Sequence, residues 1–172
     1  MTTAYTRAEL DELERIFADR IPRLATQADL RTAPRVSAVT MTGSSGGIVF
    51  MFKLLDGRFL TANLNVVAAV ELARGIATAA DHGDWEKAEL FYRRDPSMRT
   101  PTRRDAEAAA QIVSLTTAGA GPEMLIHFAA INPDQTIMIG LFQEISAEIL
   151  IGIQAAGDLA GWWTEDGALM PK

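Results

Sequence analysis

Two histidines, His82 and His127, are the residues of this chain best suited to acid–base chemistry near neutral pH. His127 lies inside the apolar stretch 123–131, where burial could tune the imidazole as a general base, with the carboxyl of Glu148 as the acid. The alternative is a structural histidine held by its neighbours. His82 is expected to cap a helix end. Neither histidine has a second histidine at ligand spacing and cysteine is absent, so we expect no metal site.

Arginine is concentrated in one short segment of an otherwise acidic chain. Five arginines fall within residues 93–104, namely Arg93, Arg94, Arg99, Arg103 and Arg104. Guanidinium groups hold carboxylates and phosphates through two parallel hydrogen bonds, so this segment could bind an anionic ligand or an acidic partner. A solvated linker is the alternative. The formal net charge of −6 argues against general nucleic-acid binding.

A glycine-rich loop, GSSGG at 43–47, is the one sequence feature that resembles a phosphate-binding motif. Such loops hold phosphate when a helix follows them, with a Lys-Ser/Thr pair at its start. Here a strand pattern follows and the pair is missing. We therefore expect a strand connection, and no cofactor.

The apolar patterns predict an α+β fold with a mainly antiparallel sheet flanked by helices. In the first half, strands are expected at 36–41, 48–55 and 59–64, with a turn at Asp56-Gly57 and with Asn65 capping a helix over 66–80. In the second half, strands are expected at 112–117, 124–131 and 136–142, and a helix at 144–160. Further helices are predicted at 6–21, at 85–92 and from Thr102, where Asp105 completes a capping box.

Two stretches of the chain, 70–85 and 147–162, are similar without a gap at an offset of 77 (147 − 70 = 77). They share Glu71/Glu148, Gly75/Gly152, Ile76/Ile153, Ala79/Ala156, Asp81/Asp158 and Trp85/Trp162. The same offset matches Val36 with Val113 and Thr40 with Thr117. We expect one domain over 1–172 with two helix-strand-strand-strand-helix halves, about 6–85 and 86–163, from internal duplication or from convergence on one pattern.

The last helix carries apolar residues around most of its circumference, whereas a surface helix needs one apolar stripe. This excess predicts a homodimer interface at Ile149, Leu150, Ile151 and Ile153.

The hairpin-and-helix segments IVFMFKLLDGRFLTANLNVVAAVELARGIATAA and MLIHFAAINPDQTIMIGLFQEISAEILIGIQAA resemble the roadblock/LC7 family of small dimeric regulatory domains. The resemblance implies a dimer without catalysis.

Together these patterns predict a non-enzymatic interaction or regulatory module that acts as a homodimer. One alternative is a small-ligand protein, for an anionic ligand among others, with a pocket between the halves near His127, Trp162 and the arginines. The other is an enzyme that uses His127 with Glu148. No leader pattern and no apolar stretch of membrane-spanning length is found, so we expect a cytoplasmic location.

Overall fold

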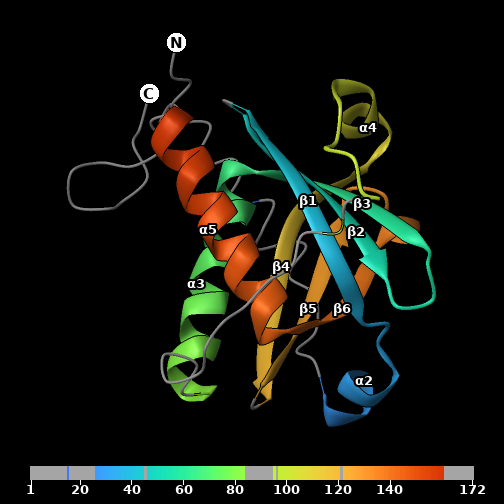
Figure 1. Cartoon of the computed structure of the whole chain (residues 1–172), viewed down its shortest axis with the longest axis vertical. Coiled ribbons are helices and arrows are strands. Elements are labelled where there is room, and N and C mark those ends of the chain that lie inside the picture. Colours follow the sequence, from blue (N-terminus) through green and yellow to red (C-terminus); the bar gives the residue numbers. More distant parts are fainter. Residues whose placement is uncertain are drawn as a thin grey trace.

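A curved six-stranded sheet with two long helices on one face forms most of the part of the chain that the structure describes (Figure 1). The structure is a computed structural model and describes Arg15, 26–44, 46–83, 95, 97–120 and 122–160 of the 172 residues. The strands are β1 (Val36–Ser44), β2 (Gly47–Leu54), β3 (Phe59–Asn65), β4 (Ala110–Ala120), β5 (Glu123–Ala130) and β6 (Ile137–Phe142). The helices are α2 (Gln27–Thr32), α3 (Val66–Gly83), α4 (Arg103–Ala108) and α5 (Gln143–Ala160), with a 3₁₀ turn at Pro133–Gln135.

The strands follow one another across the sheet in chain order. Neighbours pair antiparallel except β3 and β4, which are parallel. At the outer edges, Arg35 forms a single parallel bridge with Gly140, whose amide donates to the carbonyl of Pro34 at 2.9 Å. The sheet therefore curls until its two edges touch. The α+β fold with a mainly antiparallel sheet is confirmed.

Local chemistry explains the first hairpin and the helix that follows it. Gly57 closes the turn after β2 with a φ of 88°, a conformation that glycine adopts without steric cost. The side-chain oxygen of Asn65 accepts from the amide of Ala68 at 2.8 Å and caps α3. The predicted turn and cap are both confirmed.

The core lies between the sheet and the two long helices. The sheet face that α3 and α5 cover is called the helix face, and the opposite face is called the outer face. Phe50, Phe52 and Phe128 are fully buried on the helix face, where Phe50 and Phe52 stack with ring centroids 5.6 Å apart. Burying such a side chain stabilises the fold by about 1.5–3 kcal/mol.

The two halves share strand register, but the offset between them changes along the chain. Ser44 pairs with Gly47 and Ala120 pairs with Glu123, an offset of 76 (120 − 44 = 76). After the β5–β6 connection the offset is 77, because Phe142 takes the place of Asn65 (142 − 65 = 77). The β5–β6 connection is therefore one residue longer than the β2–β3 connection. The gapless match was therefore wrong in the first strands, where Ile112, and not Val113, corresponds to Val36.

The two long helices pack crosswise, each on the first strand of the other half. A Cβ added to Gly43 of β1 would lie 2.6 Å from the Cβ of Ala156 in α5. The corresponding contact on β4 joins Gly119 to Ala79 of α3 at 3.2 Å. Each helix is therefore buried by the half to which it does not belong.

The short helices α2 and α4 also correspond at the offset of 76. Thr26 with Asp29 and Thr102 with Asp105 form complete capping boxes at their starts. The helix start predicted at Thr102 is confirmed. The helices predicted at 6–21 and 85–92 fall outside the described residues, apart from Arg15, which is helical.

Candidate functional site

A groove of about 510 Å³ lies between the two long helices, on the side away from the sheet. The two helices lie side by side in Figure 1. This helix-pair groove is lined by Val70, Ala73, Arg74 and Ala77 of α3 and by Leu150, Gln154 and Asp158 of α5. The lining is therefore apolar apart from Arg74 on the α3 wall and Gln154 and Asp158 on the α5 wall.

The two walls of the helix-pair groove carry opposite charges. Arg74 projects from α3 and, among the described residues, pairs with Glu71 at 3.0 Å, one turn earlier on the same exposed helix face. Asp158 projects from α5 and forms no ion pair with any residue in the described part of the chain. Exposed ion pairs stabilise a fold by at most about 1 kcal/mol, so Arg74 is free to exchange its partner.

The predicted interface residues of α5 divide between the inside and the outside of the monomer. Ile149 and Ile153 are fully buried against the sheet, so a partner gains no area from them. Leu150 is half-buried at the groove, whereas Ile151 is 60 % exposed. Leu159, which follows Asp158, is 89 % exposed. The helix has two apolar stripes, and the sheet covers only one of them.

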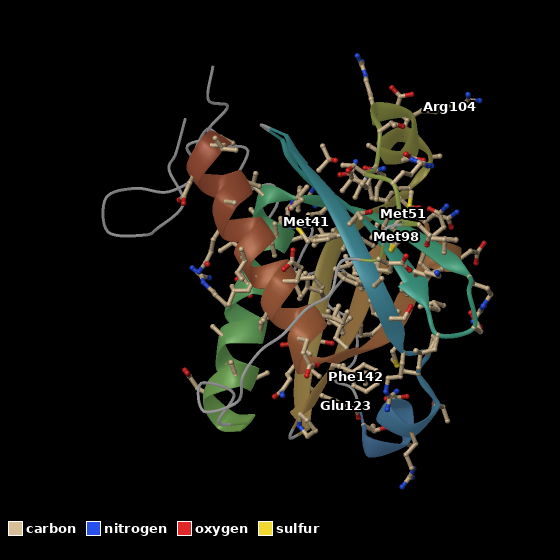
Figure 2. The ribbon with its side chains drawn as sticks, in the orientation of Figure 1. Met41, Met51, Met98, Arg104, Glu123 and Phe142 are labelled. Atoms are coloured by element: carbon tan, nitrogen blue, oxygen red, sulfur yellow. The ribbon has the colours of Figure 1, made fainter. Side chains whose placement is uncertain are left out.

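The arginines of the described part of the segment 93–104 do not converge on one point. Arg99 forms a bidentate pair with Asp105, which raises the pKa of Arg99 and holds the pKa of Asp105 well below its usual range. Arg103 pairs with Glu107 at 3.3 Å, and Arg104 is exposed on the outer side of α4 (Figure 2). Arg93 and Arg94 lie outside the described residues.

The segment before α4 lies along the outer face of β1 and β2. Residues 95 and 97–101 are here called the strap. The hydroxyl of Thr40 donates to the carbonyl of Arg99 at 2.8 Å, and the hydroxyl of Thr42 donates to the carbonyl of Pro101 at 2.9 Å. Met98 packs with Met51, as Figure 2 shows. The strap and α4 thus belong to the second half in sequence but cover the first half.

A second hollow, of about 380 Å³, lies between α4 and the outer face of the sheet. This sheet-side pocket is lined by Thr42, Val49, Asn63, Thr102, Arg103 and Ala106. The sequence indicated Arg103 as a binding residue, but it did not indicate Asn63. No local pattern could have indicated it, because α4 follows some 40 residues later in the chain.

His127 and Glu148 lie on opposite sides of the sheet. Ile126 and Phe128 face the helices, so alternation along β5 places His127 on the outer face, where it is half-buried and engaged in an interaction. Glu148 belongs to α5, on the helix face. The geometry therefore does not bring the predicted base and acid together. Trp162, which was predicted to line a ligand pocket with His127 and the arginines, lies outside the described residues.

Among the described residues, no group of three or more His, Cys, Asp or Glu side chains is placed to hold a metal ion. None of the helices in that part of the chain combines the length and the apolarity needed to cross a membrane. No family model, curated protein or solved structure matches the chain.

Proposed function

We propose that this protein is a non-catalytic interaction module that works as a homodimer, with the helix-pair groove as its interface. The observation that carries the proposal is an apolar groove with oppositely charged walls, one wall of which is formed by α5, the helix that also exposes Ile151 and Leu159. Large exposed apolar side chains next to a groove are typical of interaction surfaces. The resemblance to roadblock/LC7 domains points to the same function and stays a prediction.

A second copy of the chain is the occupant that fits this groove best. A twofold axis that runs along the groove places α3 of one copy against α5 of the other. Arg74 of one copy then meets Asp158 of the other, and the same pair forms twice. A surface that carries both charges around an apolar centre is therefore complementary to itself.

The same proposal includes an origin of the two halves by duplication. It is supported by the matching capping boxes, by the common strand register and by the reciprocal contacts of Gly43 and Gly119 with the helices. If the halves arose by duplication, α3 and α5 are equivalent helices, and each of them forms one wall of the helix-pair groove.

Replacing Ile151 by arginine tests the proposed interface. Ile151→Arg places a charge in the apolar contact, and we expect the dimer to dissociate at micromolar concentration because an unpaired buried charge costs several kcal/mol. Leu55→Arg is the matched control, since Leu55 is similarly exposed, at 64 %, but lies at the β2–β3 turn. Light scattering after size exclusion gives the mass of each variant.

Two results would reject this interface. One is a wild-type mass of 18.6 kDa, that of a single chain. The other is loss of the dimer in Leu55→Arg as well as in Ile151→Arg.

A further inference from the structure

The sheet-side pocket lies on the face of the sheet away from the proposed dimer interface. Strands of the first half supply Thr42, Val49 and Asn63, and α4 of the second half supplies Arg103 and Ala106. Its volume of about 380 Å³ falls within the range of pockets that bind small molecules. A ligand there would contact both halves at once.

The polar groups of this pocket are only partly satisfied. The amide nitrogen of Asn63 donates one long hydrogen bond, 3.4 Å, to the carbonyl of Ala106, and its oxygen accepts none from the described residues. The Arg103 side chain is 93 % exposed, and its pair with Glu107 is open to solvent. The pocket therefore offers an acceptor on the sheet wall and a cation at its mouth.

At the start of α4, the capping box already uses two backbone amides. The amide of Thr102 donates to the Asp105 carboxylate at 2.7 Å, and the amide of Asp105 donates to the Thr102 hydroxyl at 3.3 Å. Asp105 also holds Arg99. Recognition of an anion therefore depends on the guanidinium of Arg103.

The position on β6 that corresponds to Asn63 has a different neighbour, which comes from the segment before β1. Gly140 takes the place of Asn63, and the Arg35 side chain lies over it, with Cδ 2.7 Å from the position of an added Cβ. Arg35 pairs with Glu123 at 3.0 and 3.4 Å, and the two side chains are only 18 % and 23 % exposed. The chain itself thus places a guanidinium–carboxylate pair on the outer face of β5 and β6.

The junction of β3 with β4 lacks that pair. Gln111 and Gly47 occupy there the positions that Arg35 and Glu123 occupy beside β6, and Gln111 donates to the carbonyls of Ala106 and Ala109. The guanidinium of Arg103 lies at this pocket, and its ion-pair partner among the described residues is Glu107 of α4 rather than a carboxylate of a strand. A ligand can supply that carboxylate.

We propose that the sheet-side pocket binds a small aliphatic carboxylate that also carries a hydroxyl or amino group. The carboxylate pairs with Arg103, the hydroxyl or amino group donates to the side-chain oxygen of Asn63, and the aliphatic part packs on Val49 and Ala106. The site is independent of the dimer, because the sheet separates it from the helix-pair groove.

A titration with 2-hydroxy-3-methylbutanoate and its primary amide tests the site. The two probes have the same shape, so their difference in affinity measures the charge. NMR signals of the backbone amides and of the Asn63 side chain follow the titration. The acid should bind at millimolar concentration, and its primary amide should bind at least about tenfold more weakly. Arg103→Gln should remove the preference for the acid, and Asn63→Ala should weaken both probes alike.

The neighbouring arginine provides the matched control. Arg104 is exposed on the same short helix but does not line the pocket, so Arg104→Gln should leave both affinities unchanged. The proposal is overturned if the amide binds as well as the acid. It is equally overturned if Arg104→Gln weakens the acid as much as Arg103→Gln does, or if neither probe shifts the pocket signals at about 20 mM, well above the expected millimolar dissociation constant.

Discussion

At the scale of single residues, the polar contacts within the strap and α4 are local, whereas those that attach them to the sheet are long-range. Thr102 and Asp105 stand at capping-box spacing, which predicts the start of α4 without knowledge of the fold. The interaction of Asn63 with Ala106, in contrast, joins residues 43 positions apart. Its partner becomes known only once the chain has folded back over the sheet. The same limit applies to the Arg35–Glu123 pair, 88 positions apart.

Asp95 gives the attachment of the strap a dependence on pH. Hydrogen bonds from the hydroxyl and the amide of Ser97, followed by one from the Lys53 ammonium, lower the pKa of Asp95 from 3.8 to about 2. A lowered pKa in the folded state means that the ionised carboxylate stabilises the fold above about pH 4, and that this stabilisation is lost as the pH falls towards 2.

The corresponding variant is Asp95→Asn. We expect it to have a lower free energy of unfolding than the wild type at pH 7, and the difference should shrink as the pH falls from 4 to 2, because the wild type then protonates Asp95 as well. Urea unfolding at a series of pH values measures the difference. A constant difference across this range would show that the charge of Asp95 does not hold the strap.

At the scale of elements, the sequence predicted the hairpins and the helices that follow them, because alternation, turn residues and caps are local signals. It did not predict which apolar stripe of α5 meets the sheet. Ile149 and Ile153 lie on the side that the sheet buries and Ile151 on the exposed side, and apolarity alone does not distinguish these three isoleucines. The crosswise packing of the helices and the contact of Arg35 with Gly140 are also non-local, so no pattern within one half reveals them.

The close approach of α5 to β1 requires a small residue at Gly43. Gly43→Ala brings a methyl group within 2.6 Å of the Ala156 Cβ, so we expect a loss of about 1–3 kcal/mol in the free energy of unfolding. Ala156→Gly should restore part of this loss in the double variant, although it costs about 1 kcal/mol alone. Chemical denaturation of the single and double variants measures the coupling.

Gly46→Ala is the control for this experiment. An added Cβ on Gly46 meets no atom within 4 Å, so this variant should unfold within about 0.5 kcal/mol of the wild type. Additive losses in Gly43→Ala and Ala156→Gly would contradict the close contact.

At the scale of the whole molecule, one sheet separates two surfaces with different chemistry. The helix-pair groove on one side is apolar with opposite charges on its walls, which suits a second copy of the chain. The sheet-side pocket on the other side is small and carries a cation, which suits a small anion. The proposed dimer gives a role to apolar residues of α5 that the monomer leaves exposed.

Reversing the charges of the helix-pair groove tests the proposed dimer. Arg74→Asp and Asp158→Arg each place like charges opposite one another across the twofold axis, whereas the double variant restores two attractive pairs in the opposite sense. Light scattering after size exclusion at micromolar concentration compares the four proteins. We predict twice 18.6 kDa for the wild type and the double variant, and 18.6 kDa for each single variant. A double variant that stays at 18.6 kDa beside a dimeric wild type would contradict the proposed pairing, and a wild type at 18.6 kDa would contradict the dimer itself.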